Sequence, residues 1–251
     1  MDANLERITP GLVSSLLLER HMARYAFAAR FVEGLDVMDV ACGTGYGSAL
    51  LFESGAARVT GVDISEEAVD YARVHYGREG ITFVSDDAER LGFDSGCFDA
   101  VVSFETLEHI EDCRAFLRES SRVLKPEGVF IVSTPNGRYD AKNPFHRSYL
   151  SLSEFETLLR EVFPEVRPYG QLILGRAGRI KARISRLGGS LLTWQTKERL
   201  REALYRVTSR MGPKRMEPAE PTPETLASRY VTTDDIEHCK YFLAVCRTDG
   251  M

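Results

Sequence analysis

The sequence predicts an α/β protein built on a doubly wound, largely parallel β-sheet. From residue 37 to residue 133, short apolar runs of strand length alternate with segments of helical periodicity. The first run, Val37–Val40, leads through the glycine-rich turn Gly43–Gly47 into a helical pattern. In sheets of this kind a strand that turns on glycines into a helix N-terminus forms a ligand site, so we expect the binding site there.

The composition is that of a globular protein without a membrane span. The 251 residues are 43% hydrophobic and 27% charged, and no apolar stretch is long enough to cross a bilayer. The five cysteines are odd in number and form no C-x-x-C pair, which argues against a disulfide framework or a zinc site. These features favour a cytoplasmic location.

Residues 12–33 have the periodicity of an amphipathic helix, and His21, Arg24 and Tyr25 share one side of it. Two interpretations are open. The helix could cover the sheet edge with His21 and Arg24 in solvent. Alternatively, residues 1–34 could form a helical lid that brings Arg24 to the carboxylate of a bound ligand.

The glycine turn departs from the dinucleotide-binding pattern G-x-G-x-x-G, because Ser48 occupies the place of the third glycine. Asp39, before the turn, would repel a pyrophosphate but suits a ligand with an ammonium group. The second strand, Arg58–Asp63, ends in an acid at the spacing of a ribose-binding carboxylate. Asp87, after the third strand Ile81–Val84, can accept a hydrogen bond from an exocyclic amine. Together these groups predict a site for an adenosine with an amino-acid tail.

The remaining elements continue the alternation. We expect two further strands and a helix between them, then a polar loop over 137–152, a helix, and two closing strands. Their ranges are Cys97–Ser103, Cys113–Leu124, Val129–Ser133, Leu152–Val162, Val166–Leu174 and Tyr241–Arg247.

A basic segment lies between the two closing strands. From Arg176 to Arg215 there are twelve Lys and Arg residues but two acids, although the whole chain has a net charge of −5. Few aromatic residues interleave with these charges, so a nucleic-acid surface is not favoured. We expect a core of residues 35–175 and 231–251, interrupted by a basic helical insert, 176–230, that serves as a lid or pairs two copies in a homodimer.

Five blocks between residues 35 and 136 occur in the order typical of one family: VMDVACGTGYG, GVDIS, SDDAE, FDAVVSFETLEH and LKPEGVFIVSTPN. In this respect the chain resembles the class I S-adenosylmethionine-dependent methyltransferases. The resemblance implies a Rossmann-like, seven-stranded sheet whose last strand is antiparallel, with the helical insert before that strand.

The resemblance also implies S-adenosylmethionine as cofactor. Gly43 and Gly45 would approach its methionine part, Asp63 would bind the ribose hydroxyls, and Asp87 would bind the adenine amine. The other residues that we expect at the cofactor are Arg24, Tyr25, Asp39, Ala41, Ile64, Ala88 and Phe104. Ala41 stands where the family more often has glycine, and we expect only a minor change in the turn.

Methyl transfer to an alcohol requires removal of a proton, and His109 and His146 are the candidate bases. Glu105, Glu108 and His109 have the spacing of one face of a helical turn, which could hold Mg²⁺. This E-x-x-E-H pattern resembles that of ubiquinone-pathway O-methyltransferases, some of which use a metal. The alternative is a solvated helix start whose acids interact with the helix dipole.

The acceptor is indicated by residues 133–171. Their STPNG and NPFH stretches and Tyr169–Gln171 resemble methyltransferases of sugar and polysaccharide biosynthesis, which implies O-methylation of a sugar or oligosaccharide. The many polar residues in 138–149 favour a polyol. The alternatives are a small-molecule O-methyltransferase for a phenol or quinol and, less favoured, an RNA methyltransferase.

Overall fold

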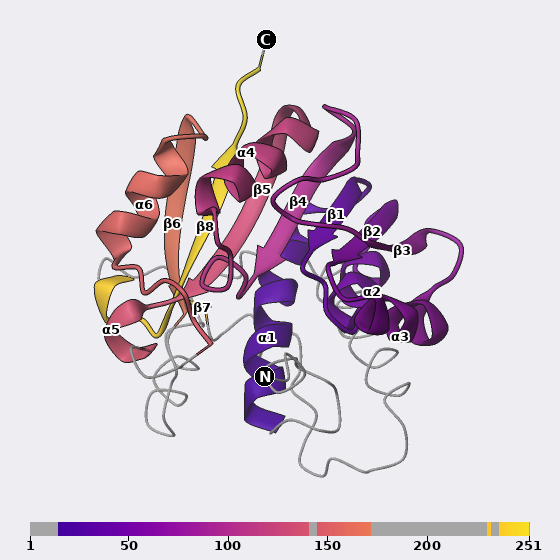
Figure 1. Cartoon of the computed structure of the whole chain (residues 1–251), viewed down its shortest axis with the longest axis horizontal. Coiled ribbons are helices and arrows are strands. Elements are labelled where there is room, and N and C mark those ends of the chain that lie inside the picture. Colours follow the sequence, from indigo (N-terminus) through magenta and orange to yellow (C-terminus); the bar gives the residue numbers. More distant parts are fainter. Residues whose placement is uncertain (1–14, 141–144, 172–229, 232–235, 251) are drawn as a thin grey trace, which may run out of the picture.

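The computed structural model describes residues 15–140, 145–171, 230–231 and 236–250. Its centre is an eight-stranded sheet in the order β3-β2-β1-β4-β5-β8-β6-β7 (Figure 1). The strands are β1 Asp36–Val40, β2 Arg58–Asp63, β3 Ile81–Ser85, β4 Phe98–Phe104, β5 Leu124–Pro135, β6 Glu165–Gln171, β7 Tyr230–Val231 and β8 Tyr241–Arg247. Strands β1 to β5 run parallel, and β8 lies antiparallel between β5 and β6.

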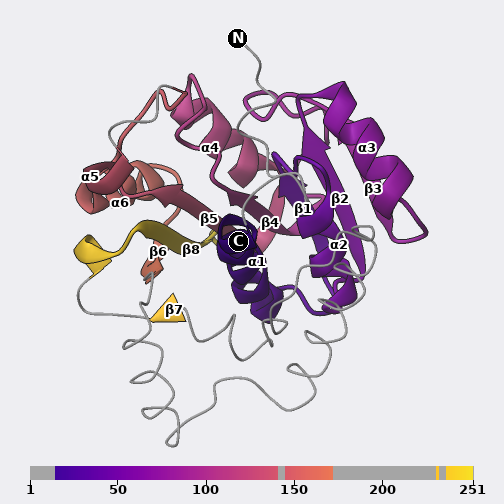
Figure 2. The ribbon, with the colours of Figure 1, turned by 90° about the horizontal axis from the view of Figure 1, so that it is seen from below.

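Helices cover both faces of the sheet. They are α1 Ser15–Ala28, α2 Tyr46–Glu53, α3 Glu66–Tyr76, α4 Cys113–Val123, α5 Gly137–Asp140 and α6 Leu152–Arg160, with short 3-10 turns at Ala29–Phe31 and Ile236–His238. Because successive strand residues point to opposite faces, β4 contributes Val102 to a core with α1, α2 and α3 and Val101 to a core with α4 and α6. Figure 2 shows α1 and α2 on the opposite side of the sheet from α4 and α6.

The predicted fold class is confirmed, including the antiparallel last strand. Two details differ. The two-residue strand β7 pairs with the end of β6 and was not predicted. Strand β5 begins at Leu124, not at Val129, because Leu124 pairs with Phe98 before a bulge in which Glu127 has a φ of +61°. The residues between the predicted helix and the strand predicted from Val129 are therefore an interruption within a longer strand.

Several predictions concern residues outside the described ranges. These include the basic insert, its amphipathic helix, and the first fourteen residues of the lid, so the division into lid, core and insert stays a prediction. Within the described part, the polar loop after β5 is not wholly irregular, because Gly137–Asp140 form the short helix α5. None of the helices described is both long and apolar enough to cross a membrane.

Candidate active site

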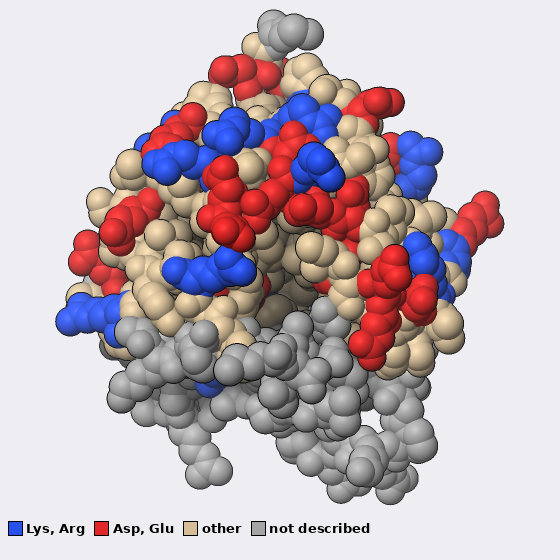
Figure 3. Space-filling model, viewed as in Figure 1, with Lys and Arg blue, Asp and Glu red and all other residues tan. Residues whose placement is uncertain are grey.

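The glycine turn after β1 is tightly packed at one glycine and open at another. Gly43 and Gly45 have φ angles of +54° and +84°, which other residues rarely adopt. A Cβ on Gly45 would lie 2.7 Å from the Cβ of Ala72, whereas one on Gly43 would meet no atom within 4 Å. Gly45 is therefore needed for packing against α3, and a ligand can approach the backbone at Gly43. Figure 3 shows the surface hollowed where, in Figure 1, the end of β4 meets α1.

Ala41 also has a left-handed conformation, with a φ of +58°. The left-handed region costs a residue with a Cβ about 1 kcal/mol relative to glycine. The turn thus has a backbone conformation suited to glycine although the residue is alanine.

Asp63 connects the end of β2 to the open turn. Its Oδ2 accepts a hydrogen bond from the Gly43 N–H at 2.8 Å, and its Oδ1 accepts one from the Ser65 N–H at 3.0 Å. The neighbouring Ile64 side chain is 72% exposed. The structure therefore places Asp63, Ile64 and Gly43 together at the carboxyl edge of the sheet, where the sequence places the ribose.

Asp39 lies beneath the turn and has side-chain partners that the sequence analysis did not identify. Its Oδ2 accepts a hydrogen bond from Ser48 Oγ at 2.6 Å, and its Oδ1 accepts one from Tyr25 Oη at 3.1 Å. The Tyr25 ring fills the space that a Cβ on Gly47 would need, at 2.0 Å. Burial raises the pKa of Asp39 to about 7, against the effect of both hydrogen bonds. Ser48, in the place of the third glycine, thus helps to fix a buried acid that joins β1, α1 and α2.

This raised pKa predicts that Asp39 lowers the stability of the fold as the pH increases. Between about pH 4 and pH 7 the unfolded chain ionises Asp39 but the folded chain does not, so the free energy of unfolding falls by on the order of 4 kcal/mol and then levels off. Asp39→Asn removes the charge and should flatten this slope. Urea unfolding at pH 5 and pH 8 measures the free energy of unfolding at each pH. The Glu79→Gln variant, which removes an exposed acid, is the control. If the free energy of unfolding of Asp39→Asn fell with pH as steeply as that of the unmodified protein, the result would contradict the prediction.

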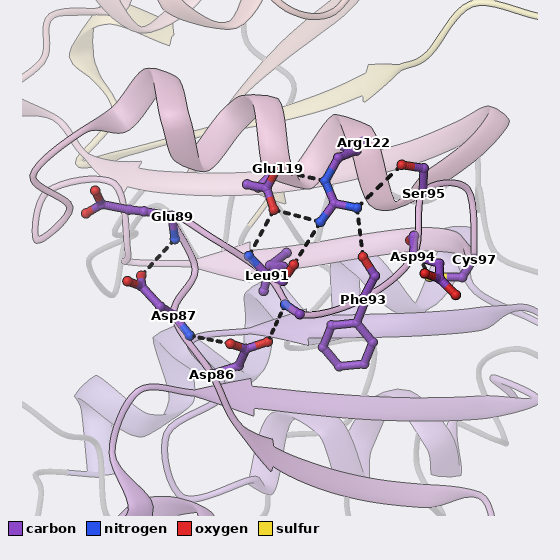
Figure 4. A network of polar contacts seen from close by, with 11 residues as sticks. Asp86, Asp87, Glu89, Leu91, Phe93, Asp94, Ser95, Cys97, Glu119 and Arg122 are labelled. Atoms are coloured by element: carbon purple, nitrogen blue, oxygen red, sulfur yellow. Dashed lines mark hydrogen bonds and ion pairs between the residues drawn. The ribbon is translucent and has the colours of Figure 1, made fainter.

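Asp87 and Ala88 follow β3 on a loop that is held by its own backbone and by α4 (Figure 4). The Asp87 carboxylate accepts a hydrogen bond from the Glu89 N–H at 2.9 Å, and Asp86 accepts one from the Gly92 N–H at 2.7 Å. Arg122 donates to the carbonyl oxygens of Leu91 and Phe93, each within 2.8 Å, and also pairs with Glu119. The sequence analysis missed Glu119 and Arg122, although their i, i+3 spacing on a predicted helix indicates a pair.

Arg24 of α1 is buried, which contradicts the interpretation that leaves its side chain in solvent. Arg24 is fully buried and donates to Gln171 Oε1 at 2.8 Å, and its guanidinium lies 4.5 Å from the centre of the Tyr241 ring. Tyr46 Oη lies 2.9 Å from His21 Nδ1, and burial lowers the pKa of His21, with a smaller effect from Arg24. Arg24 is therefore not a solvent-facing residue, and His21 is only partly exposed. Gln171, at the end of β6, was not singled out from the sequence.

Tyr25 also contacts Phe104, the last residue of β4. The two rings meet edge to face with centroids 5.0 Å apart, and both side chains are buried. These contacts bring α1 to the ends of β1 and β4. The predicted cofactor residues of α1, the glycine turn and β4 are thus assembled at one place in the sheet.

Glu105, Glu108 and His109 do not share a helical face. The segment is a non-helical turn in which Glu105 has a φ of +56°. Ser133 Oγ donates to Glu105 at 2.8 Å, and Thr134 Oγ1 donates to Glu108 at 3.1 Å. Ser133 and Thr134 are consecutive residues of β5, so their side chains point to opposite faces of the sheet. The two glutamates that they bond therefore lie toward opposite faces. The prediction that Glu105, Glu108 and His109 share one helical face is therefore wrong, because residues 105–110 are not helical.

Glu105 instead lies near the buried arginine of α1. Its Oε2 is 3.6 Å from Arg24 Nη2, with only 16% of the Glu105 side chain exposed. Arg24 and Glu105 therefore form a buried ion pair that links α1 to the end of β4.

Glu108 and His109 are joined by His146, not by Glu105. One possible ligand atom from each of the three residues lies within 4.8 Å of the others. The two imidazole rings are edge to face with centroids 4.8 Å apart. Burial, followed by the nearby Glu105 carboxylate, raises the pKa of Glu108. Both histidines proposed as alternative bases are thus in one cluster, hereafter the Glu108–His109–His146 cluster.

The loop after β5 is held against this cluster by backbone contacts. The Arg147 N–H donates to the Glu108 carbonyl oxygen at 2.6 Å, and the Gly137 N–H donates to the Leu150 carbonyl oxygen at 3.0 Å. His146 therefore reaches the cluster from a part of the sequence that no local spacing would connect to Glu108.

Residues 38–132 match the model of a methyltransferase domain family. A Mycolicibacterium smegmatis protein named as a probable S-adenosylmethionine-dependent methyltransferase is 35% identical over 205 residues, which cover 79% of this chain and 78% of the relative. The chain belongs to the S-adenosylmethionine-dependent methyltransferases. The family assignment confirms the expected enzyme class and its cofactor. It does not decide between the resemblance to sugar methyltransferases and the resemblance to ubiquinone-pathway methyltransferases.

Two further proteins are similar to this methyltransferase, one over part of its sequence and one in its fold. A ubiquinone biosynthesis O-methyltransferase of Methylocella silvestris is 32% identical over 143 residues, which cover 53% of this chain and 56% of that protein. A Haloferax volcanii methyltransferase, solved with its Trm112 activator, covers 94% of this chain with a TM-score of 0.60. Our chain covers 92% of that structure at 21% identity, so this similarity shows the fold alone.

The methyltransferase has residues that fit its cofactor. The space at Gly43 admits a ligand against bare backbone, and the Asp63 carboxylate lies at that space. A carboxylate can accept hydrogen bonds from two neighbouring ribose hydroxyls, and an exposed apolar side chain such as Ile64 can contact an adenine ring.

Proposed function

We propose that this methyltransferase transfers a methyl group to a hydroxyl of a sugar or oligosaccharide. The observation that carries the proposal is the Glu108–His109–His146 cluster, which stands just beyond the end of β4 beside a loop with exposed polar side chains. It places two imidazoles, which can accept a hydroxyl proton, at the carboxyl edge where the cofactor residues also lie.

The cofactor would be held by the residues expected from the sequence. Asp63 would bind the ribose hydroxyls, Asp87 and the Ala88 N–H the adenine, and Gly43 and Gly45 would pass close to the methionine part. Ala41 would shape the turn and Ile64 would contact the adenine. Arg24, Tyr25, Asp39 and Phe104 would enclose the methionine end. For Asp39 the structure favours an indirect role, because Ser48 and Tyr25 already bond its carboxylate.

S-adenosylmethionine, when bound, supplies a methyl group on a sulfonium that is already reactive. The protein must therefore place the acceptor oxygen in line with that group and take up its proton. His146 or His109 would accept the proton from the hydroxyl. Burial of Glu108 beside them, with Thr134 donating to its carboxylate, would fix the position of the loop residues at the reacting hydroxyl.

A divalent cation would be the alternative to a free histidine base in this proposal, because imidazoles that hold a metal are not available to accept the proton. Glu108, His109 and His146 would hold it, and it would supply a positive charge that favours ionisation of the acceptor hydroxyl. Mg²⁺ is the ion expected from the sequence, but two imidazoles and one carboxylate also suit Zn²⁺ or Mn²⁺. Glu105 is excluded from this donor set by its contacts with Ser133 and Arg24.

Phenol or quinol O-methylation is the alternative acceptor chemistry, and the M. silvestris relative favours it. An RNA acceptor would rely on the basic insert, which lies outside the described residues. The same holds for the proposed homodimer, in which the insert would pair two copies and help to close the site.

The proposal is tested by transfer of a labelled methyl group from S-adenosylmethionine to maltotetraose, mannotetraose, catechol and bulk RNA, each with Mg²⁺ and with chelator. We expect label in a saccharide. Loss of that transfer in chelator would support the metal, and transfer in chelator would assign the proton to a histidine alone. Label only in catechol or RNA would overturn the sugar acceptor.

A further inference from the structure

Exposed aromatic side chains gather on the loop beside the Glu108–His109–His146 cluster. Among the described residues, large apolar side chains that are exposed occur at Ile64, Val74, Tyr139, Phe145 and Tyr149. Three of these five lie between residues 139 and 149, and Figure 1 shows α5, which begins this segment, just beyond the end of β5. Exposing large rings is unfavourable, so a local group of them indicates a binding surface.

Phe145 and Tyr149 each contact one of the histidines, Phe145 through its backbone and Tyr149 through its ring. The Phe145 carbonyl oxygen lies 3.4 Å from His109 Nδ1, and the Tyr149 ring centroid is 6.2 Å from that of His146. The residues Phe145 and Tyr149 are 38% and 42% exposed, respectively. A molecule that rests on the Tyr149 ring would therefore lie next to the proposed base, and Phe145 directly precedes that histidine in the sequence.

The loop holds these rings in place. The backbone of Gly137 presses against Tyr149, where a Cβ on Gly137 would lie 2.6 Å from the Tyr149 carbonyl carbon. Ser148 donates to the carbonyl oxygens of Glu108 and Leu107 through its N–H and its hydroxyl, and Leu150 packs into the core under α6. A surface fixed in this way loses little freedom when a ligand binds.

We propose that Phe145 and Tyr149 form a stacking surface for the pyranose ring of the acceptor and determine its specificity. A pyranose has an apolar face of C–H groups and a rim of hydroxyls, so it needs an aromatic face edged by polar groups. Here His146 and Arg147 lie between the two rings in the sequence, and Arg147 is itself held by Glu111 at 3.0 Å. Stacking on one face leaves a rim hydroxyl free to point toward His146. This inference rests on the proposed function and names its acceptor subsite.

The test compares Tyr149→Ala, Phe145→Ala and the conservative Tyr149→Phe, with Val74→Ala on α3 as an exposed apolar control. Methyl transfer to whichever of maltotetraose and mannotetraose the unmodified enzyme uses gives KM and kcat, and a titration with S-adenosylhomocysteine checks the cofactor site. We expect each alanine variant to raise KM for the saccharide by roughly tenfold, with kcat within about twofold and unchanged S-adenosylhomocysteine affinity. Tyr149→Phe and Val74→Ala should retain the original KM.

Unchanged KM in both alanine variants, while the unmodified enzyme methylates a saccharide, would overturn the stacking surface and leave the proposed function intact. A Tyr149→Phe variant as impaired as Tyr149→Ala would also overturn it, since the hydroxyl and not the ring face would then bind. Transfer by the unmodified enzyme to catechol but to neither saccharide would overturn the proposed acceptor and this inference together.

Discussion

Replacing Asp63 with alanine is expected to weaken the binding of S-adenosylhomocysteine by about 100-fold, because two hydrogen bonds to a charged group contribute on the order of 1.5 kcal/mol each. Isothermal titration measures the change. The carboxylate also accepts hydrogen bonds from Gly43 and Ser65, so the alanine variant could lose affinity through a displaced turn.

Asp63→Asn separates these two effects. The amide keeps one acceptor oxygen for the turn but sets an NH2 group against the second backbone N–H and loses the charge. Its affinity should therefore be intermediate, and its thermal unfolding midpoint should fall by less than that of Asp63→Ala. Asp70→Asn, at an exposed acid on α3, is the control. Full affinity in Asp63→Asn together with full stability would refute the assignment of Asp63 to the ribose.

The strands and the glycine turn could be predicted because parallel strands are buried on both faces and therefore read as short apolar runs. The position of Asp63 follows from the same pattern, since an acid that ends such a strand reaches the carboxyl edge of the sheet. By contrast, the bulge before Val129 leaves no trace in an apolar pattern, because Leu124 joins the strand through its pairing with Phe98.

The Glu108–His109–His146 cluster was only partly predictable. The spacing of Glu105, Glu108 and His109 indicates one face only if the backbone is helical, and the left-handed Glu105 breaks that condition. The hydroxyls of Ser133 and Thr134 then separate the two glutamates. His146 joins the cluster through a loop that is bonded to the Glu108 carbonyl, a contact between distant parts of the chain that no local rule supplies.

His146→Ala is expected to lower the rate of methyl transfer by two to four orders of magnitude, the usual range for loss of a positioned general base. His109→Ala should have a comparable effect if the two imidazoles act together, and the double variant should then be little worse than either one. The rate at saturating S-adenosylmethionine and acceptor is the measurement, with His75→Ala, on the exposed side of α3, as control.

Glu108→Gln distinguishes a metal site from a simple base. Glutamine has the shape of glutamate and can accept from Thr134, but it supplies no negative charge to a cation. With a metal in the cluster, the variant should lose most of its activity and its affinity for Mn²⁺, measured by titration. With a histidine base alone, it should retain activity within a few fold. An inactive Glu108→Gln variant that still binds Mn²⁺ as tightly as the unmodified enzyme would contradict both accounts.

The antiparallel strand β8 has a consequence for how the protein forms during synthesis. It is the last strand in the chain, yet it lies between β5 and β6 and pairs with both along seven positions. Until residues 241–247 leave the ribosome, β6 has no neighbour to join it to the sheet, and Gln171 at its end cannot be fixed beside Arg24. The parallel half from β1 to β5 can assemble first, whereas the contacts of Arg24 with Gln171 and Tyr241 form only once β8 has joined the sheet.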